Sequence, residues 1–303
     1  MRPLALALLV PVAACSQPAD KPAATADDRG RRADTVIVAD APRTDVPGPV
    51  GADSVTTTDT PLALGDATVI VRVHTAPVTD ALASPGFEAF PLNALVLHDD
   101  EDTAVEAALD VLRQRGGRVV ELVHSGERRV TFGVEGRTYS ADPNRMFTAP
   151  GLRRTLGENG VADPEAFSAL GRFAAAAMDV YAPTPPAVVV TFHNNTEGRY
   201  SAASYAPGAE YASDAAAVTV HDGADPDDFF FVTDRAHYDA LVARGFNAVL
   251  QDNATVTDDG SLSVWAARQG VPYVNVEAQH GHRAEQARMI AALLDTLSGD
   301  SVD

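Results

Sequence analysis

The alternation of short apolar runs with longer amphipathic segments, between about Leu62 and Ser298, constrains the fold most strongly. Apolar runs of about 4–8 residues bounded by glycine, proline or polar residues indicate buried strands. The predicted strands are 67–73, 94–97, 119–123, 130–134, 187–192, 229–232 and 271–276, and the predicted helices are 103–115, 164–181, 235–244 and 283–297. This order predicts an α/β fold, a single domain with a mostly parallel mixed sheet flanked by helices.

Local signals set some of the boundaries. Asp163 precedes the helix that begins at Pro164 and is a suitable N-cap, because its side chain can accept a hydrogen bond from the first turn. Gly116-Gly117 is expected to end the first helix. The strands 119–123 and 130–134 are predicted to form a hairpin with its turn at Ser125-Gly126.

The first 61 residues differ from the rest. In residues 1–14, Arg2 precedes an apolar run too short to span a bilayer, which predicts a secretory signal peptide. Residues 15–61 are rich in Ala, Asp, Pro and Thr and are expected to form a flexible acidic tether. Residues 62–303 are then the folded domain.

Cys15 is the only cysteine and follows Val12-Ala13-Ala14. A lone cysteine forms no internal disulfide. A branched apolar residue and two small residues before a cysteine resemble the lipobox of bacterial lipoproteins, which implies lipidation at Cys15. We therefore expect an exported, membrane-anchored protein facing the periplasm or the cell exterior. Cleavage without lipid, giving a free periplasmic or secreted protein, is the alternative.

The net charge of −19 at pH 7 argues against nucleic acid and anionic membrane surfaces as partners. Contact with a membrane is therefore expected through the N-terminal lipid alone.

Three predicted strands end in side chains that bind metals or move protons: His98, His193 and Glu277. In open α/β sheets, ligands bind beyond the carboxyl ends of the strands. His98 begins a His-x-x-Glu pattern with Glu101, between a buried strand and a helix. The same pattern occurs at His124/Glu127, in the predicted hairpin, and at His282/Glu285, at the start of the last helix. We interpret His124/Glu127 as part of a solvated turn. We interpret His282/Glu285 as residues with a surface or capping role.

Two imidazoles and a carboxylate with an open fourth position are typical of a catalytic zinc site. The sequence predicts His98, Glu101 and His193 as ligands of Zn²⁺, and Glu277 as the catalytic carboxylate that transfers protons. Asp99 and Asp100 are expected to be solvated or to lie behind the ligands, where Asp99 could orient a histidine. The Asn144-Arg145 pair in a loop is a candidate carboxylate binder, although a surface arginine is the simpler interpretation.

The order His-x-x-Glu, Asn-Arg, His, Glu resembles the zinc carboxypeptidase superfamily, including its aspartoacylase and succinylglutamate desuccinylase branch. The resemblance spans about residues 93–278. It implies zinc bound by His98, Glu101 and His193, a substrate carboxylate bound by Asn144 and Arg145, and Glu277 as general base and acid. The family often has a carbonyl-polarising arginine and a closing tyrosine, which the motifs leave open: the candidates are Arg128, Arg129 and Arg137, and Tyr200, Tyr205, Tyr211 and Tyr238.

The resemblance implies a zinc-dependent amide hydrolase for substrates with a free carboxylate, such as small peptides, peptidoglycan stem peptides or N-acyl amino acids. Two alternatives stay open. One is a non-catalytic lipoprotein of the same fold that binds carboxylate ligands, and the other is a zinc-dependent esterase or deacetylase.

Overall fold

A computed structural model describes residues 55–78, 92–157 and 163–299. The chain divides into two units, residues 1–47 and 48–303, and every described residue belongs to the second. The predicted signal peptide, Cys15 and most of the predicted tether lie outside the described residues. Within the described ranges, no helix combines the length and the apolarity needed to cross a membrane.

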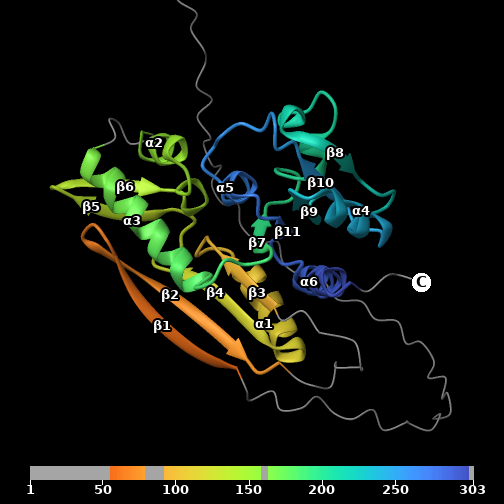
Figure 1. Cartoon of the computed structure of the whole chain (residues 1–303), viewed down its shortest axis with the longest axis horizontal. Coiled ribbons are helices and arrows are strands. Elements are labelled where there is room, and N and C mark those ends of the chain that lie inside the picture. The colour runs from red at the N-terminus through yellow and green to blue at the C-terminus, as the bar shows by residue number, and fades with distance from the viewer. Residues whose placement is uncertain (1–54, 79–91, 158–162, 300–303) are drawn as a thin grey trace, which may run out of the picture. The chain divides into compact units, whose positions relative to one another are not determined.

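A sheet of nine strands forms the centre of the fold (Figure 1). Its order is β1-β2-β4-β3-β7-β11-β9-β10-β8. The strands are β1 (Thr56–Leu64), β2 (Ala67–Ala76), β3 (Leu92–Val96), β4 (Gly117–Val123), β7 (Val189–Asn195), β8 (Ala215–Thr219), β9 (Phe229–Val232), β10 (Ala248–Gln251) and β11 (Tyr273–Gln279). The contiguous strands β4, β3, β7 and β11 are parallel, and antiparallel pairs close both edges. The predicted fold class, an α/β domain with a mixed sheet flanked by helices, is confirmed.

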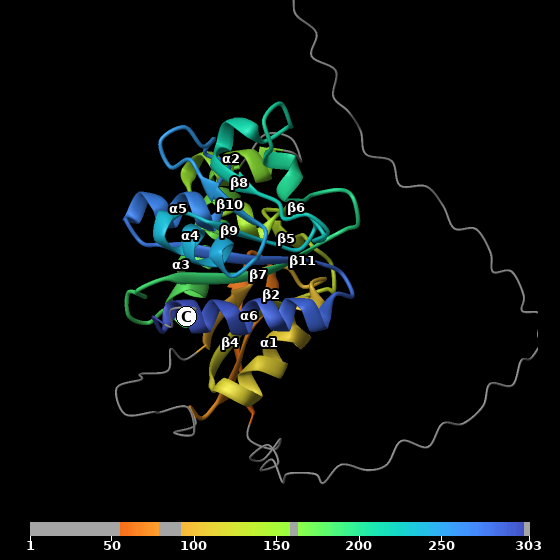
Figure 2. The same cartoon turned by 90° about the vertical axis from the view of Figure 1, so that its right-hand side faces the viewer.

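Helices cover both faces of the sheet. They are α1 (Asp102–Arg115), α2 (Ala149–Gly157), α3 (Pro164–Tyr181), α4 (Arg235–Ala243), α5 (Leu262–Gln269) and α6 (Arg283–Leu297). Figure 2 shows α1 and α6 side by side against one face, and α4 packs into the same apolar cluster. The opposite face packs against α2, α3 and α5. Both faces of the central strands are therefore buried, which is why those strands read as continuous apolar runs.

Strand alternation sorts the side chains of β7 between these two cores. Val190 and Phe192 pack with α1 and α6, whereas Val189 belongs to the cluster that contains α3 residues. Thr191 and His193 share the face of Val189. The same alternation places Tyr273, Asn275 and Glu277 of β11 on that face. One face of the central strands thus carries a row of polar groups that ends at the carboxyl edge of the sheet.

The structure differs from the sequence prediction in one strand pairing and in where the folded part begins. The predicted hairpin does not form, because β4 pairs with β2 and β3 in the main sheet. Its expected partner, β5 (Val130–Val134), pairs instead with β6 (Arg137–Ala141). The real two-residue turn is Glu135-Gly136, and both residues have positive φ, as a tight hairpin turn requires. The tether boundary also shifts, because residues 56–61 form part of β1 and pair with β2.

The four predicted helices are present with ends within one residue of those expected. The Asp163 side chain accepts a hydrogen bond from the Glu165 amide, so the predicted cap is confirmed. Helices α2 and α5 were not predicted. They are short, and Pro150-Gly151 near the start of α2 favours a turn on local propensity.

Candidate metal centre and substrate cavity

The carboxyl ends of β3, β7 and β11 bring the predicted site residues together. Val96 of β3 is opposite Phe192 of β7, and Glu277 of β11 is directly opposite His193. Because these three neighbours run parallel, the residues that follow them reach the same edge of the sheet. His98 lies two residues beyond β3, and the following turn places Glu101 at the N-cap of α1.

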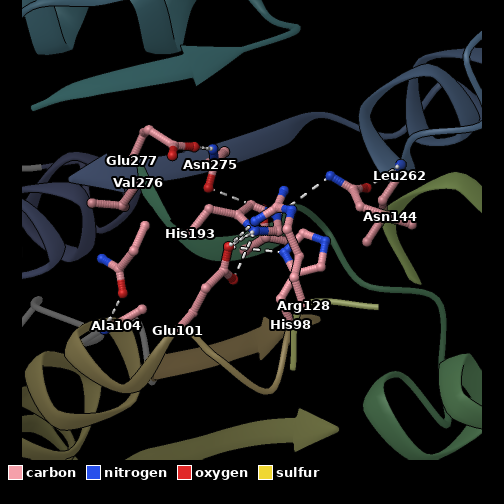
Figure 3. A network of polar contacts seen from close by, with 12 residues as sticks. His98, Glu101, Ala104, Arg128, Asn144, His193, Leu262, Asn275, Val276 and Glu277 are labelled. Atoms are coloured by element: carbon pink, nitrogen blue, oxygen red, sulfur yellow. Dashed lines mark hydrogen bonds and ion pairs between the residues drawn. The ribbon is translucent and has the colours of Figure 1, made fainter. Parts of the chain in front are cut away.

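The Glu101 carboxylate lies between two imidazole rings (Figure 3). His98 Nδ1 is 2.8 Å from Glu101 Oε1, and His193 Nδ1 is 2.9 Å from Glu101 Oε2. The two ring centroids are 5.0 Å apart. All three side chains are buried, and one potential ligand atom from each lies within 4.8 Å of the others. This is the geometry of three donors that can close around one metal ion.

Asp142 determines the orientation of the His98 ring. Its Oδ1 lies 2.9 Å from His98 Nε2, which leaves Nδ1 to face Glu101. Asp142 is itself held, because its amide donates to Thr155 Oγ1 at 2.8 Å. A carboxylate behind a ligand histidine fixes the tautomer and makes the ring a better donor.

The orienting role that the sequence left open for Asp99 therefore falls to Asp142. The Asp99 carboxylate instead accepts from the amides of His124 and Gly126, at 2.6 and 2.7 Å. Asp142 was missed because its contact with His98 joins residues 44 positions apart.

Charge interactions in this cluster outweigh the cost of burial. Burial lowers the pKa of His98, but the Glu101 charge and the Asp142 hydrogen bond together raise it to about 9. Burial also opposes ionisation of Glu101, and the two histidines nevertheless hold its pKa well below the usual range. The cluster is thus organised around a negative charge that favours a cation.

Glu277 occupies a different electrostatic environment. Burial raises its pKa, and the nearby Glu101 charge adds to this effect. Asn275 Nδ2 donates to Glu277 Oε2 at 2.8 Å, which holds the carboxylate in place. Asn275 Oδ1 accepts from Thr191 Oγ1, and Thr191 Oγ1 in turn contacts the Tyr273 hydroxyl at 2.6 Å. A raised pKa is the direction that suits a carboxyl group exchanging protons near neutral pH.

Asn144 and Arg145 lie in a short 3₁₀ turn, Pro143–Arg145, and line a cavity of 810 Å³ beside the cluster. Asn144 Nδ2 is 3.5 Å from His193 Nε2, and its Oδ1 accepts from the Leu262 amide at the start of α5. The Arg145 side chain is 34% exposed and lies 3.4 Å from Asp259. The structure thus places Asn144 against His193, and both residues of the predicted Asn-Arg pair on the cavity beside the cluster of His98, Glu101 and His193.

Among the three candidate arginines, Arg128 reaches the site. Its Nη1 is 3.1 Å from Glu101 Oε1, and the residue lines the cavity. Arg129 instead donates to Ser140, and Arg137 is exposed at the start of β6. No sequence pattern distinguished the three, because only the folded chain shows which one contacts Glu101.

Three of the four candidate tyrosines line the cavity: Tyr200, Tyr205 and Tyr211. The hydroxyls of Tyr200 and Tyr205 are 2.6 Å apart. Burial raises the pKa of Tyr200, so this hydroxyl is protonated at neutral pH. Tyr238 lies elsewhere, in α4, where its hydroxyl contacts Thr219.

Neither of the other His-x-x-Glu copies joins the cluster. His124 follows β4 and contacts Ser125 Oγ, and Glu127 is exposed. His282 precedes α6 and binds Asp228 through Nδ1 at 2.8 Å, whereas Glu285 pairs with Arg288. The surface interpretation fits His282, whose side chain is 34% exposed, but the solvated turn expected at His124 is wrong, because that side chain is only 6% exposed.

No family profile and no curated protein match the chain. Solved structures that are similar include murein-tripeptide amidase MpaA from Escherichia coli O157, with 15% identity over 82% of this chain and 93% of that one, and a TM-score of 0.39. A protein assigned as a succinylglutamate desuccinylase/aspartoacylase from Shewanella frigidimarina has 12% identity over 81% and 72%, and a TM-score of 0.39. A protein assigned as a metallopeptidase from Shewanella baltica has 13% identity over 80% and 85%, and a TM-score of 0.37. These proteins are of the kinds that the motif order resembles.

Proposed function

We propose that this protein is a zinc-dependent hydrolase of amide bonds in substrates that carry a free carboxylate. Metallocarboxypeptidases and amidases of N-acyl amino acids or peptidoglycan peptides both fit this description. The observation that carries the proposal is the buried convergence of His98, Glu101 and His193.

The donor set fits zinc. Each histidine offers Nδ1, the Nε2 of His98 is engaged by Asp142, and Glu101 offers a carboxylate. Two histidines and one glutamate, with a cavity on the open side, match a catalytic zinc site better than a closed structural one. When bound, zinc would polarise the scissile carbonyl and lower the pKa of a coordinated water.

Each of the remaining site residues has a separate role in the proposed reaction. Arg145, with Asn144, binds the substrate carboxylate through paired hydrogen bonds. Arg128 is placed to donate to the carbonyl oxygen as it gains negative charge. Glu277 takes a proton from the attacking water and delivers it to the leaving nitrogen as the C–N bond breaks. Asn275 keeps the Glu277 carboxylate oriented for both transfers.

Export as a lipoprotein is a separate part of the proposal. It rests on the apolar run before Cys15 and on the residues Val12-Ala13-Ala14. Mass spectrometry of the protein from the membrane fraction is expected to find diacylglycerol on an N-terminal Cys15. A soluble protein with an unmodified Cys15 would contradict lipidation.

The decisive experiment has two stages. Metal content is first measured by plasma mass spectrometry on the full chain purified without chelators. About one zinc per chain is expected, as in a site of this type. Wild type and Glu277→Gln are then assayed on a peptide and N-acyl amino acid panel, with acyl esters and acetylated sugars included. Zinc binding without hydrolysis, but with retained carboxylate binding, would favour a non-catalytic binding lipoprotein. Turnover of the esters or acetyl sugars alone would favour the esterase or deacetylase.

A further inference from the structure

Most polar groups on the inner face of the sheet are satisfied by one another, but three residues that line the cavity, Asp100, Asn195 and Gln251, each carry a buried side-chain oxygen without a partner among the described residues. Thr191, Tyr273, Asn275 and Glu277 form a continuous set of hydrogen bonds. Gln251, at the end of β10, also lines the cavity and is 2% exposed. Its side-chain oxygen Oε1 is buried and has no donor among the described residues.

The neighbouring hydrogen bonds determine which end of the Gln251 amide is free. Asn253 Nδ2 donates to the Thr233 carbonyl at 2.9 Å, so Asn253 Oδ1 must face the other way. Gln251 Nε2 donates to that oxygen at 2.9 Å. A flipped Gln251 amide would place two oxygens against each other. Oε1 is therefore the unpartnered atom, and it is an acceptor.

The position of Gln251 relates this acceptor to the substrate cavity. Val249, two residues earlier in β10, packs in the cluster that contains Tyr205 and Phe231. The pairing of β10 with β8 is irregular between Leu250 and Gln251, so the position of Gln251 follows from its place in the cavity lining and not from strand alternation. Tyr205 and Phe231 line the cavity together with Arg145. The residue that carries the free acceptor therefore lines the cavity in which Arg145 is proposed to hold a carboxylate.

The cavity lining contains both acidic residues and the arginines Arg154 and Arg199, so a positively charged donor would find its partners among the carboxylates. Glu210 and Asp214 line the same cavity, and neither forms an ion pair with another residue that the structure describes. The Asp214 carboxylate accepts from the Thr257 amide. Asp259, by contrast, is paired with Arg145.

We propose that Gln251 recognises the side chain of the substrate residue whose carboxylate Arg145 binds, and that this side chain ends in an N–H donor, an ammonium or an amide. This inference rests on the proposed function for the role of Arg145. An apolar side chain of the same length would leave the Gln251 acceptor buried and unpaired, which disfavours its binding.

Equilibrium binding tests the inference without catalysis. Calorimetry on the zinc-loaded full chain compares lysine, glutamine and norleucine, each as L and D enantiomers. Wild type is expected to bind lysine or glutamine about 10-fold more tightly than norleucine, as expected for one buried hydrogen bond to a charged or amide donor. Lysine alone would identify the ammonium, and glutamine alone the amide.

Two variants assign this preference to Gln251. Gln251→Leu keeps the size of the side chain and removes the acceptor, so the preference is expected to fall to near unity. Gln251→Glu retains an acceptor and is expected to keep or increase the lysine preference. Gln269→Leu, the same change at an exposed position of α5, is the matched control and is expected to behave as wild type. Thermal melting of each variant establishes that it is folded.

Equal binding of the three amino acids, binding of none, or an unchanged preference in Gln251→Leu would overturn the inference. A Gln251 oxygen that stays bonded to water when lysine is bound would also overturn it. Assays on peptides ending in lysine or norleucine separate the two proposals. Selective lysine binding without hydrolysis rejects the proposed function alone, and hydrolysis without side-chain discrimination rejects this inference alone.

Discussion

Two clusters of histidine and carboxylate side chains lie in the described part of this molecule, and each contains the histidine of a His-x-x-Glu motif. His98, Glu101 and His193 are buried between parallel strands and their connections. Asp225, Asp228 and His282 lie at a surface where the His282 side chain is 34% exposed. In the second cluster the motif glutamate, Glu285, turns away to Arg288.

The difference shows that the motif alone does not gather three buried donor side chains around one point. In the first cluster, burial removes competing water, and both histidines face one carboxylate. In the second, one histidine pairs with one aspartate in an ordinary surface arrangement. His282 also follows a central strand, β11, so the two motifs differ in the burial of their side chains and in the second histidine that faces the same glutamate in the first cluster.

The largest contrast is expected in metal content. His193→Ala removes one of three buried donors, so zinc is expected to fall from about one per chain to near zero, and hydrolysis with it. His282→Ala is expected to keep the full zinc content. Plasma mass spectrometry on both variants makes the comparison. Equal zinc loss in the two would show that the clusters do not differ in the way proposed.

The next effect concerns proton transfer. Glu277→Gln keeps the shape of the side chain but cannot accept a proton, so kcat/KM is expected to fall about 10²- to 10⁴-fold with zinc retained. Glu285→Gln, in the surface motif, is expected to retain full activity. Steady-state assays with parallel metal analysis separate the two outcomes. Full activity of zinc-loaded Glu277→Gln would exclude the proposed mechanism.

A smaller loss of zinc affinity is expected when the carboxylate that contacts the proposed ligand His98 is changed. Asp142→Asn leaves the volume unchanged but removes the charge that orients His98, so zinc affinity is expected to fall about 10- to 100-fold. Asp228→Asn makes the same change beside His282 and is expected to leave zinc affinity unchanged. Competition with a chromogenic chelator measures both. An unaffected Asp142→Asn would mean that His98 is oriented by other contacts.

The smallest expected effect is a pH-dependent change in stability from the surface cluster that contains His282. The hydrogen bond with Asp228 raises the pKa of His282 above its unfolded value of about 6.5. The stability from this contact is therefore complete below that value and is lost as pH rises through the raised pKa. Because the pair is part-exposed, it contributes about 1 kcal/mol or less.

Urea unfolding of wild type and His282→Ala tests this pH dependence. The variant is expected to be less stable than wild type at pH 6, and the two are expected to converge by pH 9. A difference that grows with pH would contradict the assignment.

Individual residues show which features of the fold local sequence patterns predict and which they do not. The four predicted helices and the strands that deliver His98, His193 and Glu277 follow from apolar periodicity and capping residues. The pairing of β4 with β2 and β3 does not, because an apolar strand of this kind can pair equally well with several partners. The hairpin turn lies at Glu135-Gly136 and not at Ser125-Gly126, because β5 pairs with β6 while β4 pairs within the main sheet.

The sequence by itself determined the fold class, the order of the predicted ligands and the strand ends that carry them, since these depend on side-chain type and short-range spacing. The tertiary structure alone decided that Asp142 orients His98, that Arg128 is the arginine at Glu101, and that Gln251 lines the cavity with a buried oxygen that has no donor among the described residues. The first two contacts join residues 44 and 27 positions apart, and the third depends on strands and loops meeting around one cavity. No local sequence pattern predicts such long-range contacts, because they depend on how the whole chain packs.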